Sequence, residues 1–204
     1  MAEWAKLLDC ARAVVEGAAV PECARFLAGW PGSAAARAVR SEPLAVLCWL
    51  DAAVDGAPAG PLAALAREVR AAAPRLAWRQ TYRAGQVSAA FLARYGWCEI
   101  AGASGPVPCA SLAAGLLLLG PHTHYPVHGH VAEELYIPLS GAAAWQRGDG
   151  AFSVRQPGEA IHHASDEPHA MRTGAAPLLA LYLWRGEGLG ASARLRHGAP
   201  RAPG

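Results

Sequence analysis

The histidines of this chain are concentrated in one stretch, and their spacing there is that of a β-strand. Seven of the eight histidines lie between residues 122 and 169. Four polar residues in this stretch have even numbers: His128, His130, Glu134 and Tyr136. Side chains two residues apart on a strand point to the same face. If residues 127–139 form one strand, or a hairpin whose turn at 131–133 preserves this parity, all four project into one interior.

Two imidazoles and a carboxylate on one face supply most of the ligands of a divalent metal ion. An isolated His-x-His pair is more often a coincidence on the protein surface. Here the pair is followed by Glu134, by Gly141 and, about thirty residues later, by a second cluster of His162, His163 and His169. The pattern therefore indicates a metal site.

Helices are expected in the first part of the chain, where apolar residues recur at helical spacing. The expected helices cover residues 3–17, 21–29, 34–54 with an interruption at Pro43, and 60–73. Glycine- and proline-rich turns separate them. These segments carry no candidate chemistry, so we interpret them as packing helices.

From about residue 86, short apolar runs alternate with glycine and proline turns, as in a small antiparallel barrel or jelly roll. We therefore expect a mainly β protein with three parts. They are an N-terminal helical segment (1–82) packed on the barrel, a β-barrel with the metal site (83–188) and a flexible C-terminal tail (189–204).

Composition excludes several classes of protein. A hydrophobic content of 53% in 204 residues is enough to bury a core, and a net charge of +2 does not suggest binding to nucleic acid. The five cysteines form no Cys-x-x-Cys pair, which favours a reducing cytoplasm. The N-terminal residues mix charges into their apolar run, unlike a signal peptide. Residues 112–120 are too short to span a bilayer.

The histidine pattern resembles the two metal-binding motifs of the cupin superfamily. In the first motif His128, His130, Glu134 and Gly141 match, whereas His122 occupies the position of a leading glycine. The resemblance implies a cupin barrel, also called a double-stranded β-helix or jelly roll.

The second cupin motif is matched at Gly158 and His169. Three positions depart from its usual proline, glycine and asparagine: Ala164, Asp166 and Thr173. His162 is a rival for the ligand role. We prefer His169, because residues 167–171 look like the turn and strand start that present the last ligand of a cupin.

A closer resemblance covers most of the second half of the chain. It is carried by the segments 78–82, 95–97, 115–121, 125–126, 128–136, 140–141, 157–158, 169–171 and 180–184, together with His162. These segments are similar to the cupin-type dimethylsulfoniopropionate (DMSP) lyases of the DddQ type and their lyase-like relatives. Tyr125 and Tyr136 flank the ligands behind a helical segment, which is the mark of that family.

The resemblance implies a carbon–sulfur lyase with one divalent metal ion per chain. Its ligands would come from His128, His130, Glu134 and His169, which suit zinc, iron or manganese. The metal would act as a Lewis acid on the substrate carboxylate. A base removes the neighbouring proton, dimethyl sulfide leaves, and acrylate remains.

Tyr136 is the first choice for this base, because a nearby cation stabilises a phenolate. Tyr125 is expected at the mouth of the site, as the second choice for the base or as a proton shuttle. The alternative for both is a half-buried strand tyrosine with a backbone partner. Substrate binding is assigned to Trp184, His128 and Tyr125, with the Trp184 ring receiving the sulfonium, although a core tryptophan is almost as common in such a strand.

The other aromatic residues and histidines are expected to support the fold. Trp78, Tyr82 and Trp97 would join the helical segment to the barrel. The three histidines treated as surface or supporting residues are His122, His124 and His163. His163 should point away from His162 if both lie on a strand.

Two other functions stay open at this point. A different metal-dependent cupin enzyme, an isomerase or an iron oxygenase acting on another small carboxylate, would use the same ligands. A non-catalytic cupin that senses a small ligand is the last choice, because the first half shows no DNA-binding motif. The expected partner is a small-molecule substrate, without nucleic acid or membrane. Whether two copies form a homodimer is open.

Overall fold

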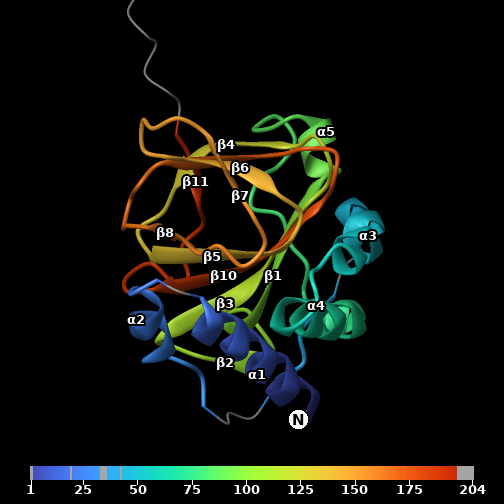
Figure 1. Ribbon diagram of the computed structural model, residues 1–204, viewed down its shortest axis with the longest axis vertical. Helices are drawn as coiled ribbons and strands as arrows, with labels where there is room; N and C mark the ends of the chain where they lie inside the picture. Colours follow the sequence, from blue (N-terminus) through green and yellow to red (C-terminus); the bar gives the residue numbers. More distant parts are fainter. Residues whose placement is uncertain (1, 19, 33–35, 42, 197–204) are drawn as a thin grey trace, which may run out of the picture.

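The computed structural model describes residues 2–18, 20–32, 36–41 and 43–196 (Figure 1). Its helices are α1 (Ala2–Gly17), α2 (Cys23–Leu27), η1 (Ala45–Trp49), α3 (Leu50–Asp55), α4 (Pro61–Ala72), η2 (Ala73–Arg75) and α5 (Ala89–Leu92). Its strands are β1 (Tyr95–Gly102), β2 (Val107–Pro108), β3 (Leu112–Leu119), β4 (His124–Gly129), β5 (Glu133–Ser140), β6 (Ala143–Arg147), β7 (Ser153–Arg155), β8 (Ile161–His163), β9 (His169–Thr173), β10 (Leu178–Arg185) and β11 (Arg194–Leu195). None of the helices within these ranges is long and apolar enough to cross a membrane.

The strands form two sheets that face each other. The larger sheet has the order β2-β1-β3-β10-β5-β8, and the smaller one the order β11-β4-β9-β6-β7. Paired strands are antiparallel except β1 and β2. Figure 1 shows α1 and α4 against the side of the larger sheet that is turned away from the smaller sheet. The predicted fold class, a jelly-roll barrel preceded by helices, is confirmed.

The leucine run of β3 is apolar at every position because this central strand is buried on both faces. Leu116 and Leu118 belong to the core shared with the helices, whereas Leu117 and Leu119 belong to the core between the sheets. The same alternation on β10 separates Leu181 from its neighbour Tyr182. The interior of the barrel thus receives the residues of one parity, and the tyrosines are among them.

The segment 127–139 is not one continuous strand. β4 ends at Gly129 in the smaller sheet, the chain bends at residues 130–132, and β5 begins at Glu133 in the larger sheet. The alternative of a turn in this region is therefore correct. His128 and Glu134 line the same cavity because the two sheets face each other, and strand parity alone does not bring them there.

The helix expected at 34–54 is wrong in its first half. Residues 36–41 are not helical, residues 33–35 and 42 lie outside the described part, and helical structure begins at Ala45. Pro43 disfavours a helix in the residue before it. Arg37 holds this segment against the loop that follows β1, since its amide donates to Pro106 O and its Nε to Gly105 O at 2.8 Å each.

Residues 189–196 pack onto the barrel, although the sequence assigns 189–204 to a flexible tail. Residues 189–193 line the main cavity, and Arg194 and Leu195 pair with β4 as strand β11. The backbone amide of Arg196 donates to Val127 O at 2.8 Å. Edge pairing to β4 satisfies these backbone groups. Residues 197–204 lie outside the described residues.

Gly115 on β3 is a position where only glycine fits. A Cβ atom there would lie 2.1 Å from Cys98 O and 2.5 Å from the Tyr182 hydroxyl. We expect Gly115→Ala to lower the free energy of unfolding by about 1–3 kcal/mol, because the backbone of β1 would have to move. Chemical denaturation measures this. Gly174→Ala, where no atom lies within 4 Å of the added Cβ, is the control. Equal stability of the two variants would contradict the prediction.

Candidate metal centre and active site

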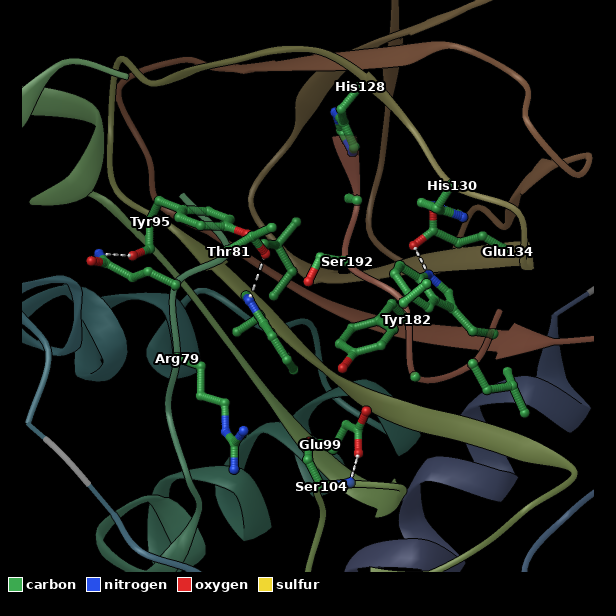
Figure 2. A pocket seen from close by; sticks show the side chains of 18 of the residues that line it. Arg79, Thr81, Tyr95, Glu99, Ser104, His128, His130, Glu134, Tyr182 and Ser192 are labelled. Atoms are coloured by element: carbon green, nitrogen blue, oxygen red, sulfur yellow. Dashed lines mark hydrogen bonds and ion pairs between the residues drawn. The ribbon is translucent and has the colours of Figure 1, made fainter. Parts of the chain in front are cut away.

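A cavity of about 390 Å³ opens between the two sheets (Figure 2). Its lining comes from the segment before β1, from strands β1, β3, β4, β5 and β10, from the loop after β1 and the bend after β4, and from residues 189–193. The lining includes the sequence-predicted residues His128, His130, Glu134, Tyr125, Tyr136 and Trp184. The cavity therefore gathers residues of both sheets around one space.

Three candidate ligands converge where His130 and Glu134 line one end of this cavity, with His169 in contact with Glu134. His130 lies in the bend after β4, Glu134 near the start of β5, and His169 at the start of β9. His130 Nε2 lies 3.0 Å and His169 Nε2 lies 3.2 Å from the same oxygen, Glu134 Oε2. One donor atom from each residue lies within 4.8 Å of the others, and all three residues are buried. This group is able to bind a metal ion.

The protons of these histidines are directed away from the centre. His130 Nδ1 donates to Ala132 O and His169 Nδ1 to Glu167 O, each at 2.8 Å. A carbonyl oxygen only accepts, so Nδ1 of each ring carries a proton and Nε2 is the nitrogen that faces Glu134, where Nε2 of His130 lies within hydrogen-bond distance of Oε2. Histidines that bind metals are usually held by such an outer hydrogen bond.

Charge is concentrated at this end of the cavity. Burial favours the neutral form of Glu134, but His130 and His169 outweigh it and hold the pKa of this carboxyl well below its usual value. Burial opposes the charged form of His130, but the Glu134 charge prevails and raises the pKa of the imidazole. His169 Nε2 is not aligned for a hydrogen bond and has no such partner in the described residues. A buried carboxylate beside two imidazole nitrogens, one of them without a hydrogen-bond partner in the described part of the chain, fits a divalent cation.

His128 lies beside this group and is not one of its three members in the described structure. Its ring centroid lies 4.1 Å from that of His169, with which it also pairs across β4 and β9. Its Nδ1 donates to Pro126 O at 2.9 Å, so it has the same proton placement as the other two. Burial lowers the pKa of this imidazole well below its usual value, which keeps it neutral.

Tyr136 lies on β5 and is 5% exposed. It borders the cavity next to Glu134 and packs at a centroid distance of 5.0 Å from Trp145 of the opposite sheet. Burial and the negative charge of Glu134 raise the pKa of Tyr136 well above its usual value. Ionisation of this phenol therefore needs a compensating positive charge.

Tyr125 is buried and does not lie at the mouth of the site. Its ring stacks on His128 with 3.9 Å between centroids. Its hydroxyl lies 3.3 Å from the hydroxyls of both Tyr82 and Tyr95. The chain of polar groups continues from Tyr95 through Thr81, at 2.9 Å. Burial, followed by the neighbouring tyrosines, raises the pKa of Tyr125 well above its usual value.

Two of the aromatic residues expected to join helices and barrel contribute to this tyrosine cluster instead. Tyr82 bonds to Tyr125, and Trp97 lines the cavity while its Nε1 donates to Thr81 at 3.0 Å. Trp78 is buried in the core shared with the helices, as expected.

Trp184 makes two contacts with the candidate metal centre. Its Nε1 donates to Glu134 Oε1 at 2.5 Å, and its ring centroid lies 4.2 Å from that of His130. The two strands bring these groups together, since Trp184 of β10 is the cross-strand partner of Glu134 on β5. The indole therefore orients the carboxylate and also forms a wall of the cavity.

Of the remaining described histidines, three lie on the outside of the barrel and His163 lies in its interior. His122 and His124 are exposed, as expected. His162 bonds to Glu133 at 2.8 Å on the outside of the larger sheet, whereas His163 is fully buried and stacks on His169 at 4.1 Å. Burial and the neighbouring His169 lower the pKa of His163 to about 2, so its ring is neutral.

Several residues in or next to the cavity were not predicted from the sequence as site residues. Tyr182 and Glu99 both border the cavity, and Tyr95 bonds to Tyr125. A signal existed for Tyr182, which has the parity of Trp184 two residues later. For Glu99 the signal is a single acidic residue in the otherwise apolar run of residues 95–102.

Glu133 ties the helical segment to the barrel. It receives bonds from Arg185 at 2.6 Å and His162 at 2.8 Å, and forms an ion pair with Arg25 of α2 at 2.8 Å. Burial opposes its charge, but these three partners prevail and lower its pKa below the usual 4.5. A carboxyl with a lowered pKa stabilises the fold above its unfolded value, and this stability is lost as the pH falls through the folded value.

We therefore expect Glu133→Gln to lower Tm at pH 7 by about 2–4 °C, for a network worth about 1 kcal/mol. The difference from the unsubstituted protein should shrink below about pH 4.5, where Glu133 of the unfolded chain becomes protonated, and should vanish once the pH falls below the lowered pKa of the folded state. Thermal unfolding between pH 3 and 7 measures it. A difference that does not depend on pH would argue against an ionic role.

Comparison with known families gives a match to the dimethylsulfoniopropionate lyase family over residues 24–180. The chain is 37% identical over 110 residues to the dimethylsulfoniopropionate lyase DddQ of Ruegeria pomeroyi, covering 54% of this chain and 55% of that protein. It is 35% identical over 143 residues to the putative dimethylsulfoniopropionate lyase DddL of Cereibacter sphaeroides, covering 69% and 59%. The matched segments thus span little more than half the length of these relatives.

Solved structures are similar over nearly the whole chain. A chain from crystal structures of the DMSP lyases RdDddP and RnDddQII has a TM-score of 0.84 at 35% identity, covering 96% of this chain and 98% of that one. The crystal structure of DMSP lyase DddQ from Ruegeria pomeroyi DSS-3 also has a TM-score of 0.84, at 28% identity and 98% coverage of both chains. The helical segment and the barrel both take part in the similarity.

Proposed function

This chain belongs to the dimethylsulfoniopropionate lyase family, and on that premise we propose that it cleaves DMSP into dimethyl sulfide and acrylate. The observation that carries this proposal is the convergence of His130 and His169 on Glu134 Oε2 in a cavity also bordered by Tyr136. A metal-ligand set beside a buried phenol is suited to removing a proton next to a carboxylate.

We propose His130, Glu134 and His169 as metal ligands, with His128 as the fourth. His128 lies beside His169, and the bond from its Nδ1 to Pro126 O leaves Nε2 as the nitrogen suited to a metal ion, which supports that addition. A divalent cation bound here would draw negative charge from the substrate carboxylate and favour ionisation of a nearby phenol. Zinc, iron and manganese all suit these ligands, with one ion per chain.

Tyr136 is the proposed base. Its phenolate oxygen accepts the proton from the carbon next to the carboxylate, and the electrons of that C–H bond form the new double bond. The C–S bond breaks with its electron pair on sulfur, so dimethyl sulfide leaves as a neutral molecule. Tyr125, which is buried behind His128 among other hydroxyls, is suited to relaying the proton. The Trp184 ring forms a wall for the sulfonium end.

Headspace gas chromatography for dimethyl sulfide tests the proposal. Protein reconstituted with zinc, iron or manganese is incubated with DMSP, and the His130→Ala variant is the control. Release by the loaded protein that the variant abolishes is the expected result. No release with any of the three metals would reject DMSP as the substrate and direct the search to other small carboxylates with an acidic α-proton.

A further inference from the structure

Glu99 is a buried carboxylate in the cavity that the proposed reaction does not use. It lies on β1, is 8% exposed, and borders the same cavity as Glu134. Arg79 and Arg83 also line this cavity, but both are exposed. The inner wall of the cavity therefore carries a second carboxylate, Glu99, besides the candidate metal ligand Glu134.

The register of the larger sheet puts Glu99 in one row with the proposed base. Glu99 pairs with Gly115, Gly115 with Tyr182, and Tyr182 with Tyr136. Cross-strand partners point to the same face of a sheet, so this row crosses the cavity floor. Adjacent strands are about 4.8 Å apart, which puts the Glu99 backbone about 10 Å from that of Tyr182.

Gly115 leaves this row open between Glu99 and Tyr182. Its missing side chain leaves room for the Tyr182 hydroxyl, which would lie 2.5 Å from a Cβ atom at that position. Tyr182 thus leans over β3 toward β1. Figure 2 shows one oxygen of Glu99 on the side of Tyr182, and Tyr182 between Glu99 and Glu134. After burial, Glu99 is the group that most raises the pKa of Tyr182.

The following loop holds the Glu99 carboxylate by one oxygen. The amides of Ser104 and Gly105 donate to Oε2 at 2.6 and 3.0 Å. A Cβ atom at Gly102 would lie 2.7 Å from the same oxygen. Within the described residues these two bonds are the only ones that the carboxylate accepts, so Oε1 is available to the cavity.

We propose that Glu99 is the specificity residue for the cationic end of the substrate, holding the sulfonium by charge beside Tyr182 and Trp184. This inference rests on the proposed function. A substrate bound by its carboxylate at the His130–Glu134–His169 end would extend its cation away from that end, along the row that leads to Glu99. A buried carboxylate is stabilised by a cation that replaces part of its lost hydration.

The role of Glu99 would be in binding and not in the chemical step. The positive charge on sulfur disappears as the C–S bond breaks, so attraction to Glu99 is weaker in the transition state than in the bound substrate. Glu99→Gln is therefore expected to raise KM for DMSP by about tenfold, with kcat unchanged or higher. The neutral dimethyl sulfide would no longer be held.

Two ligands of equal shape and different charge test this inference without catalysis. 3-(Trimethylammonio)propionate carries the cation, and 4,4-dimethylpentanoate replaces its nitrogen by carbon. Calorimetric titration of the metal-loaded protein is expected to show about tenfold tighter binding of the cationic ligand. Glu99→Gln, which keeps an oxygen for the loop amides, should remove this preference. Glu159→Gln is the matched control, since Glu159 also accepts a backbone amide, that of Gln156, and does not border this cavity.

Equal binding of the two ligands by the unsubstituted protein would overturn the inference without the need for any variant. Loss of affinity for both ligands in Glu99→Gln would also overturn it, because that result indicates a role in loop structure. A cation preference that depends on Glu99, found in a protein that releases no dimethyl sulfide, would reject the proposed function and retain this inference. Release of dimethyl sulfide without any cation preference would retain the proposed function and reject this inference.

Discussion

Tyr136→Phe is expected to lower kcat for dimethyl sulfide release by about 10²–10⁴-fold, the usual contribution of a general base. The variant keeps the ring that packs on Trp145 and removes only the hydroxyl that would accept the proton. Folding and metal content should therefore be unchanged. Single-turnover release of dimethyl sulfide, with circular dichroism and metal analysis of the same samples, measures the effect.

Tyr125→Phe separates the two candidate bases. Tyr125 is surrounded by Tyr82, Tyr95 and His128, so its hydroxyl would act on the substrate only indirectly, by passing a proton along the neighbouring hydroxyls. We expect a smaller loss of kcat in this variant than in Tyr136→Phe. If the Tyr125 variant is the inactive one and the Tyr136 variant is active, Tyr125 is the base and the assignment must be reversed.

His169→Ala is expected to reduce metal affinity by more than about 100-fold, since loss of even an outer hydrogen-bond partner of a ligand costs about 10–100-fold. The variant removes one of the two imidazole nitrogens that lie next to Glu134 Oε2 and reduces the proposed ligand set from four residues to three. Activity should be lost together with the metal. Metal titration with a competing chelator, followed by elemental analysis, gives the affinity.

His162→Ala is the matched control for that experiment. His162 is the rival ligand of the sequence motif, but in the structure it bonds to Glu133 on the outside of the sheet. This variant should bind metal as the unsubstituted protein does. Loss of metal in His162→Ala, with retention in His169→Ala, would show that the proposed ligand set is wrong.

Local patterns predict much of this fold because burial repeats with the period of each element. The alternation on β3 and β10 and the helical periodicity of residues 3–17 reflect burial of fixed faces, and α1 is found where it is expected. The prediction of a helix at 34–54 is wrong in its first half because Arg37 binds a loop that lies about 65 residues further along the chain. The spacing of apolar residues in that stretch does not predict such a long-range contact.

The sequence by itself determined the class of the fold and the candidate donor residues, including His130, Glu134 and His169. Spacing along one strand was the wrong reason for their proximity, since β4 and β5 belong to different sheets. Only the tertiary structure decided that the two histidines lie next to the same oxygen of Glu134 and that Trp184 donates to its other oxygen. It also decided that Glu99 borders the same cavity. The physical reason is that periodicity records which face of an element is buried, whereas the packing of two sheets decides which buried side chains meet.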